Sequence, residues 1–253
     1  MEIQQIHEGL LELLIAFDDF CQAHNIQYSL HSGTLLGAIR EKGFIPWDDD
    51  VDVTITRAQY QKLVAALADN HTYHVVGNIK KQFRKNGNND FWVDLFICDY
   101  ISEKPLAQKM KQLSLTLLDV MSRDKHTIKL SDMGKHSKPK QLLFKLCYYL
   151  GKLLPTRCKT KLYDLVSRKM YLGNKTLYVR SNDQYKGRIV LVPVEWLVDF
   201  TRVPFEHTAM PVTTQYHEML TSIYGDNYMT PVKDGRNSQV HDLIRAEGED
   251  ISL

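Results

Sequence analysis

Hydrophobic and polar residues alternate with two different periods along the first hundred positions of the chain. Apolar residues recur every three or four positions over residues 3–21, which is the spacing of an amphipathic helix. Over residues 50–55, acids and a threonine alternate strictly with valine and isoleucine, which predicts a strand with Asp50, Asp52 and Thr54 on one face. Similar patterns predict strands over 26–31 and 91–100, a short helix after residue 32, a helix with Thr56 as its N-cap, and a hairpin over 73–86.

The pattern changes twice in the second half of the chain. Residues from about 103 to 172 have the spacing of helices, and the final third returns to short strands and turns before a helix over 213–225. No internal repeat and no linker rich in glycine, serine or proline separates these parts. We therefore expect a single α+β domain over residues 1–253, with a mixed β-sheet flanked by helices and a helical insertion at about 103–172.

Composition narrows the class of protein only a little. The 253 residues are 43% hydrophobic, so one sizeable core is expected. The formal charge of +2 argues neither for nor against nucleic acid, and no nucleic-acid partner is expected. The four cysteines form no C-x-x-C pair, which argues for reduced thiols in a cytoplasmic protein rather than a zinc site or a disulfide framework. The N-terminal residues lack the basic region of a signal peptide, and no uncharged apolar stretch approaches the ~18 residues that span a bilayer.

The acidic stretch GFIPWDDDVDV, residues 43–53, carries the strongest chemical signal. Asp48, Asp50 and Asp52 match the first acids of an EF-hand, but that loop needs a glycine where this chain has Val53. On a strand, Asp50 and Asp52 instead leave the same face, as two oxygen ligands for Mg²⁺ or Mn²⁺. Asp94, the one acid in the middle of the buried strand FWVDLFICDY, is the expected third ligand.

A predicted phosphate-binding turn precedes these acids. Ser32, Gly33 and Thr34 stand at the start of the short helix, where free N–H groups attract anions and a glycine lets a ligand approach the backbone. A strand, a small-residue turn, a helix and then D-x-D on the next strand is the order of the nucleotidyltransferase superfamily. The expected fold is therefore nucleotidyltransferase-like.

The same segment resembles the signature of the LicD family of phosphocholine transferases, to which the fukutin-related ribitol-phosphate transferases are also similar. The family pattern Gly-Thr-Leu-Leu-Gly, an arginine, Gly-Phe-Ile-Pro-Trp-Asp-Asp-Asp and an apolar–Asp pair is present from Gly33 to Asp52. VDLFICDY resembles a later family block with changes at Leu95, Ile97 and Cys98, and MPVTTQYHEMLTSIYGDNYMTPV resembles the C-terminal block with Asn227 inserted.

The resemblance implies transfer of a phospho-alcohol, such as phosphocholine, from a CDP-activated donor to a hydroxyl of a cell-surface glycan, with release of CMP. Asp50 and Asp52 would hold Mg²⁺ or Mn²⁺, and Asp94 would hold a second metal or accept the proton of the attacking hydroxyl. Phosphate contacts are expected from the turn at 32–34 and from Arg40 and Arg84. Asp48 and Trp47 are expected to support the site.

Three other functions use some of the same features. A glycosyltransferase of the D-x-D type would want a nucleotide-binding half ahead of the motif, and here the motif ends at residue 52. A nucleotidylyltransferase acting on a small molecule would release pyrophosphate instead of CMP. A metal-stabilised binding module would bind metal without turnover.

The predicted insertion is strongly basic. Ten lysines and arginines stand against one acid, Asp164, between Lys135 and Lys169, and apolar residues are interleaved with them. A basic amphipathic helix binds anionic membrane surfaces, and lipid-linked glycan acceptors lie at such surfaces. We therefore expect peripheral contact with the inner face of the cell membrane, whereas a solvated lysine-rich helix is the alternative.

Overall fold

The computed structural model describes residues 2–123 and 138–231, with the side chains of 138–140 excepted. Contacts divide the chain into two compact units. Among the described residues, the first comprises 2–99 and 178–231, and the second comprises 100–123 and 138–177. The expected insertion at 103–172 falls within the second unit, and the expectation of one domain with an insertion stays a prediction.

The first unit is built on a mixed sheet. Its seven described strands follow the order β1-β2-β5-β4-β3, with β6 paired to β5 and β7 paired to β6. β2 and β5 are parallel, and both β1 against β2 and β4 against β5 are antiparallel. A separate hairpin joins β8 to β9. The strands are β1 (Ser29–Leu30), β2 (Asp52–Thr56), β3 (Tyr73–Val76), β4 (Lys81–Lys85), β5 (Val93–Ile101), β6 (Leu177–Arg180), β7 (Leu191–Pro193), β8 (Phe200–Phe205) and β9 (Thr208–Thr213).

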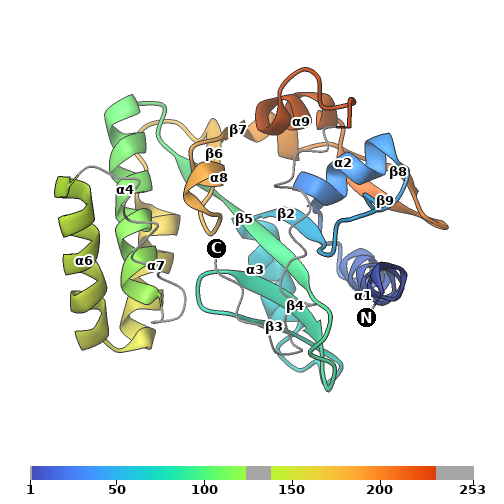
Figure 1. Cartoon of the computed structure of the whole chain (residues 1–253), viewed down its shortest axis with the longest axis horizontal. Helices are drawn as coiled ribbons and strands as arrows, with labels where there is room; N and C mark the ends of the chain where they lie inside the picture. The colour runs from blue at the N-terminus through green and yellow to red at the C-terminus, as the bar shows by residue number, and fades with distance from the viewer. Residues whose placement is uncertain (1, 124–137, 232–253) are drawn as a thin grey trace. The chain divides into compact units, whose positions relative to one another are not determined.

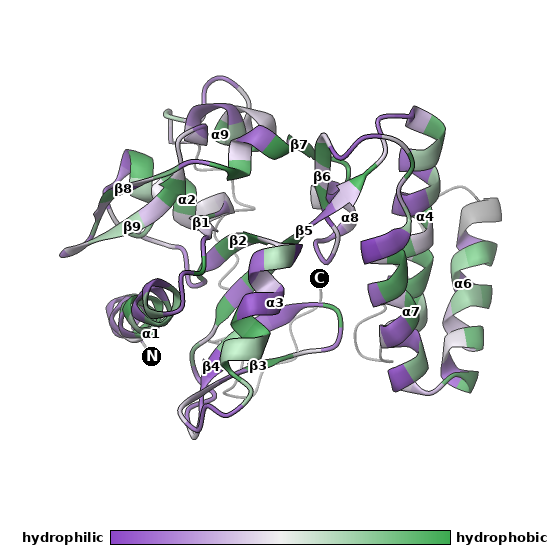
Figure 2. Ribbon diagram, turned by 180° about the vertical axis from the view of Figure 1, so that it is seen from behind, coloured by the Kyte–Doolittle hydropathy of each residue, from purple (hydrophilic) through white to green (hydrophobic). Residues whose placement is uncertain are grey.

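Helices pack around this sheet as the hydrophobic pattern predicts. They are α1 (Ile3–Ala23), α2 (Ser32–Arg40), α3 (Arg57–Ala66), the short α8 (Tyr185–Arg188) and α9 (Tyr216–Tyr224), with a 3₁₀ turn over Val194–Leu197. α3 covers one face of the sheet, as both views of the ribbon show (Figures 1 and 2). Phe17 of α1 packs edge-on against Phe83 of β4, with ring centroids 5.0 Å apart. The helix predicted at 3–21 and the hairpin are confirmed. The helix predicted at 213–225 is also present, but it begins at Tyr216, because Thr213 still belongs to β9. The N-cap is confirmed, since the Thr56 side chain accepts from the Gln59 N–H.

Two predicted strands have different bounds. The strand expected over 26–31 is only Ser29–Leu30, because Ile26 still bonds back to the end of α1 and α2 begins at Ser32. The strand expected over 50–55 begins at Asp52, so Asp50 lies in the preceding loop. Pairing with β1 covers only Val53 and Thr54, and the His31 N–H donates to the Asp52 carbonyl just before it. The prediction that Asp50 belongs to the strand is therefore wrong.

The second unit is helical among its described residues, apart from the strand ends that it shares with the sheet. α4 (Pro105–Ser122) packs against both α6 (Lys138–Leu153) and α7 (Thr156–Lys169). The Lys111 amine is fully buried and donates to the carbonyls of Tyr100 and Ser167, each at 2.6 Å. None of the described helices is both long enough and apolar enough to cross a membrane.

Candidate active site

A cavity of ≈ 350 Å³ opens in the first unit at the amino-terminal ends of β2 and β5. Six carboxylates are part of its described lining, and the backbone brings them there from four places. The loop before β2, β2 itself and β5 supply five of them, and the turn after β6 supplies one. These carboxylates are Asp48, Asp49, Asp50, Asp52, Asp94 and Asp183.

The register of the sheet fixes the two central acids. Asp52 lies directly opposite Asp94 on the parallel strands β2 and β5, and the Asp94 N–H donates to the Val51 carbonyl at 2.8 Å. The Gln82 side chain of β4 donates to Asp94 Oδ1 at 3.0 Å, and Trp92 Nε1 lies 3.4 Å from Asp94 Oδ2. The structure thus brings together Asp50, Asp52 and Asp94, although Asp50 reaches the cavity from a loop.

The start of α2 is fitted closely to the acidic loop. A side chain at Gly33 would place its Cβ 2.4 Å from Asp48 Oδ2, so any larger residue would require the Asp48 carboxylate to move. Ser32 has a φ of 49°, a left-handed backbone that is unusual for serine and concentrated at functional sites. Its hydroxyl lies 3.2 Å from the Tyr224 hydroxyl on α9. Ser32 and Gly33 both line the cavity, as a phosphate-binding turn requires.

Thr34 and Asp48 have structural contacts that the sequence did not reveal. The Thr34 hydroxyl is buried and accepts the Asp52 N–H at 2.9 Å, so it holds β2 in place. His7 of α1 lies 2.6 Å from the Asp48 carbonyl through Nε2 and stacks on Phe44 at 4.4 Å between ring centroids. Trp47 is partly buried against the hydrophobic core.

The two arginines expected at the phosphates lie away from the described lining of the cavity. Arg40 donates to Glu41 at 2.7 Å and to the Tyr228 carbonyl at 3.4 Å. Arg84 lies over the Trp92 ring, 4.6 Å from its centroid, and donates to Gln82 at 2.8 Å. Both Trp92 and Gln82 line the cavity, so Arg84 supports its wall from behind.

Burial and crowding shift the acids toward their protonated forms. Burial raises the pKa of Asp52 well above its usual range, and the neighbouring Asp50 and Asp94 carboxylates raise it further. Burial, followed by Asp50 and Asp49, raises the pKa of Asp48 to about 8. Burial also raises the pKa of Asp94, opposed by the Gln82 hydrogen bond and by Lys80. The pKa of Tyr224 is raised to about 12, first by burial and also by the acids that face it, while the hydrogen bond to Ser32 lowers it.

This donor set fits a divalent cation that arrives with phosphates. Among the described residues, no three histidine, cysteine, aspartate or glutamate side chains converge closely enough to hold a metal ion by themselves. Mg²⁺ is commonly bound by one or two carboxylates together with substrate phosphates and water. Asp50 and Asp52 offer such a pair in one cavity, and a cation between them would relieve the repulsion that raises the Asp52 pKa.

Comparison with known proteins decides the family. Residues 25–151, half of the chain, match the family model described as LicD/FKTN/FKRP, nucleotidyltransferase domain. The chain belongs to the LicD family. The predicted membership, the nucleotidyltransferase-like fold class and the expectation of an enzyme of the LicD type are thereby confirmed.

Individual relatives agree with this membership of the LicD family. The chain is 28% identical over 247 residues to the lipopolysaccharide cholinephosphotransferase LicD of Haemophilus influenzae, covering 88% of this chain and 90% of that protein. It is 33% identical over 79 residues to an uncharacterized protein of Rickettsia typhi, which is 27% of this chain and 26% of that protein. An uncharacterized protein of Rickettsia prowazekii is 46% identical over 47 residues, covering 19% of this chain and 18% of that protein.

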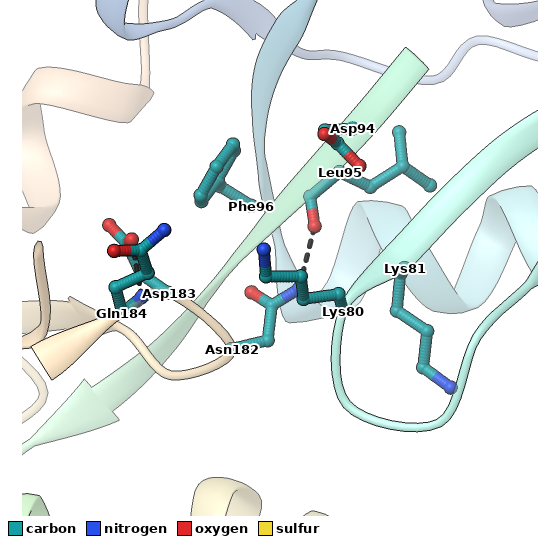
Figure 3. A pocket seen from close by; sticks show the side chains of 8 residues that line it. All are labelled: Lys80, Lys81, Asp94, Leu95, Phe96, Asn182, Asp183 and Gln184. Atoms are coloured by element: carbon teal, nitrogen blue, oxygen red, sulfur yellow. Dashed lines mark hydrogen bonds between the residues drawn. The ribbon is translucent and has the colours of Figure 1, made fainter. Parts of the chain in front are cut away.

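The LicD-family cavity also contains residues that the sequence patterns missed. Figure 3 shows Lys80, Asp94 and Asp183, which come from three separate segments around a small neighbouring pocket. Asp183 follows β6, and the only available signal was a polar run after a short strand, RSNDQ. Lys80 follows the hairpin turn before β4, where a lysine is ordinary in sequence. In both cases the tertiary fold, rather than a local pattern, makes the residue part of the site.

Asn182 explains why Asp183 lies where it does. Its side chain accepts the Ile97 N–H and donates to the Leu95 carbonyl, both at 2.7 Å, and the second bond is drawn in Figure 3. The pairing of β4 with β5 reaches Leu95. From there the Asn182 side-chain amide makes the hydrogen bonds to β5 that a neighbouring strand would otherwise make. This holds the turn against β5 and sets Asp183 at the cavity wall.

A second cavity of ≈ 240 Å³ adjoins the acidic one in this LicD-family chain. Ser32, Asp183 and Gln184 line both cavities, so the two are neighbours. The second one also has the cationic side chains of Arg180 and Lys186 in its lining. Together the two cavities offer carboxylates for a metal, a turn for phosphates, and cations beside them.

Proposed function

We propose that this protein transfers a phospho-alcohol, with phosphocholine as the first candidate, from a CDP-activated donor to a hydroxyl of a cell-surface glycan such as lipopolysaccharide. One observation carries the proposal. The chain belongs to the LicD family, and it gathers Asp50, Asp52 and Asp94 in one cavity beside the turn at Ser32 and Gly33. The alignment with the lipopolysaccharide cholinephosphotransferase of Haemophilus influenzae, which covers 88% of the chain, supports phosphocholine and the glycan acceptor.

In the proposed reaction, Asp50 and Asp52 would hold Mg²⁺ or Mn²⁺ beside the donor's phosphates. The bound cation would neutralise the charge that builds up on the diphosphate when its P–O bond breaks. The backbone N–H groups at the start of α2 face the phosphates, and the Ser32 hydroxyl adds a donor. The acidic cavity receives the phosphoryl group that is transferred. The adjoining cavity, lined by Arg180 and Lys186, receives the rest of the donor molecule.

Asp94 is the proposed general base. Burial raises its pKa, and the Gln82 and Trp92 hydrogen bonds orient its oxygens. The acceptor hydroxyl attacks the phosphorus distal to the cytidine, a new P–O bond forms, and CMP leaves with the electron pair of the broken P–O bond. The hydroxyl proton passes to Asp94.

A panel of activated alcohols tests the proposed reaction. Purified protein is incubated with Mg²⁺, lipopolysaccharide or a soluble oligosaccharide, and CDP-choline, CDP-ethanolamine, CDP-glycerol or CDP-ribitol in turn. We expect CMP release and acceptor labelling with one donor, and loss of both when EDTA removes the metal. Pyrophosphate release from a nucleoside triphosphate would indicate a nucleotidylyltransferase, and turnover of a sugar nucleotide would indicate a glycosyltransferase. Metal binding with no turnover of any donor would indicate a binding module.

Lys80 is the proposed phosphate contact in place of the two arginines. It is the one cation in the described lining of the acidic cavity, and its side chain is exposed at the rim. A charge-assisted bond to phosphate contributes about 1.5–3 kcal/mol, so Lys80→Ala is expected to raise the donor KM about tenfold or more. The smaller effect is expected on kcat, because the ammonium contacts the donor in its ground state as well.

Lys85→Ala is the matched control for Lys80→Ala. Lys85 is the last residue of β4, the strand that follows Lys80, and it pairs with Glu12 at 3.4 Å on the exposed surface. Its replacement should leave both constants unchanged. An unchanged donor KM in Lys80→Ala would remove this lysine from the site and return Arg84 as the candidate.

A further inference from the structure

α6 has an exposed apolar face. Its exposed large apolar residues, together with the one that follows the helix, recur at positions i, i+1, i+4, i+7, i+8, i+11 and i+12, which places them in one stripe along a helix. Their exposed fractions run from 39% to 79%. Figure 2 shows the hydrophobic colouring of α6. We call these residues the α6 stripe: Leu142, Leu143, Leu146, Tyr149, Leu150, Leu153 and Leu154.

The opposite face of α6 attaches it to α4. Cys147 is buried on that face, and a Cβ at Gly151 would lie 2.6 Å from Met121 Cα, so the two helix backbones approach closely. The Lys159 amine of α7 joins their ends, because it donates to the carbonyls of Met121 and Gly151 at 3.1 and 3.0 Å. The packing face of α6 is thus already used, and the stripe is additional to it.

Basic residues border the stripe along one side. On the helical repeat, Lys145 and Lys152 lie along one border of it, and the Lys152 amine lies over the Tyr148 ring at 4.6 Å. Residues 141–172 contain seven lysines and arginines against one acid, Asp164. An apolar face bordered by lysines is complementary to the surface of an anionic lipid bilayer, where apolar acyl chains lie beneath negatively charged headgroups.

We infer that the α6 stripe docks on the surface of an anionic lipid bilayer. The leucines enter the boundary between headgroups and acyl chains, Tyr149 lies at that boundary, and Lys145 and Lys152 contact the acidic headgroups. α6 has 16 residues, which suits a helix lying in the interface plane. A second copy of the chain is the less suitable occupant, because an antiparallel two-fold pairing of two stripes would place both lysine borders on the same side.

Vesicle co-sedimentation tests the inference. The full chain is mixed, without donor or metal, with vesicles of phosphatidylcholine alone or with three parts in ten of phosphatidylglycerol, at 150 mM salt. We expect sedimentation with the anionic vesicles only. Reversal of two lysines in K145E/K152E should weaken partitioning at least about 25-fold, because each basic residue near the surface contributes about 1 kcal/mol. L146Q/L150Q should weaken it about tenfold for each leucine.

Substitutions on an exposed helix of the first unit give the matched control. Lys62 and Val64 of α3 are exposed, and K62E/V64Q changes charge and apolarity in the same sense without touching α6. It should bind anionic vesicles as the wild type does. Wild-type protein that stays in the supernatant overturns the inference, and so does a dimer by light scattering that L146Q/L150Q converts to monomer. Because vesicle binding needs no donor, this result is independent of the proposed transfer reaction.

Discussion

Asp52→Asn is expected to abolish transfer and to raise the thermal stability of the protein free of donor and metal. The Asp52 side chain is buried, with 8% of the residue exposed, and faces Asp50 and Asp94. The amide keeps the shape of the carboxyl but carries no charge, so it removes both a metal ligand and a source of repulsion. The contact of the Asp52 N–H with Thr34 belongs to the backbone and is retained.

The two effects have separate magnitudes and separate measurements. CMP release should fall at least about 10³-fold, which corresponds to about 4 kcal/mol of transition-state stabilisation. The free energy of unfolding should increase by about 1–2 kcal/mol, or about 3–6 °C in Tm by calorimetry. Thr54→Val on the same strand is the control, because it alters a buried polar group without a carboxylate.

The gain in stability should depend on pH in a definite direction. The pKa values of Asp52 and Asp48 are higher in the folded chain than in the unfolded chain, so the folded state binds more protons. Wild-type stability without metal should therefore fall as the pH rises from about 5 through 8, and less so in Asp52→Asn. Wild-type activity in Asp52→Asn, or a lower Tm at pH 8, would contradict the assignment of Asp52 as a crowded metal ligand.

Asp99→Ala is expected to lower the free energy of unfolding more than Asp52→Asn, Asp94→Ala or Glu12→Ala changes it. Asp99 is 2% exposed, and Arg57 binds both of its oxygens, at 2.8 and 2.7 Å. The Ser181 hydroxyl also donates to it. Removal of the carboxylate leaves the arginine without its bidentate partner and should cost about 3 kcal/mol, or about 6–12 °C in Tm.

Two comparisons distinguish this structural role from catalysis. Glu12→Ala breaks the exposed pair with Lys85, at 3.4 Å, and should change the free energy of unfolding by less than about 0.5 kcal/mol. Asp94→Ala should abolish CMP release and leave the Tm near that of the wild type. If Asp99→Ala instead kept its Tm and lost CMP release, Asp99 would belong to the active site and Asp94 would need a new role.

Asp94 and Asp99 also show what the sequence could predict. Both stand in the strand FWVDLFICDY, and their separation by five positions places them on opposite faces, which alternation alone establishes. Register then decides which face is which, because Asp94 pairs with Asp52 across β2 and β5. The family pattern marked both residues, but the contacts that separate a cavity acid from a buried ion-pair acid come only from the fold.

The remaining site residues depended on contacts between distant segments. Asp183 reaches the cavity because Asn182 bonds to β5, 85 and 87 positions away in the chain. Arg40 and Arg84 have the chemistry of phosphate ligands, but Arg40 donates to the Tyr228 carbonyl and Arg84 lies over the Trp92 ring, outside the described lining of the cavity. Thr34 belongs to the predicted phosphate-binding turn, but its hydroxyl accepts a hydrogen bond from the Asp52 N–H. Local periodicity predicts helices and strands. The contacts of an individual side chain depend on hydrogen bonds between segments that are distant in sequence.

The direct pairing of Asp52 with Asp94 has a consequence for how the donor is bound. Positions fixed by adjacent hydrogen-bonded strands vary little, so these carboxylates are held at their spacing before any ligand arrives. When the donor and its cation bind, the cation takes the place of the protons that neutralise these carboxylates. This exchange requires little movement of the backbone. Donor binding in the presence of Mg²⁺ should therefore be accompanied by proton release, with a stoichiometry that grows as the buffer becomes more acidic.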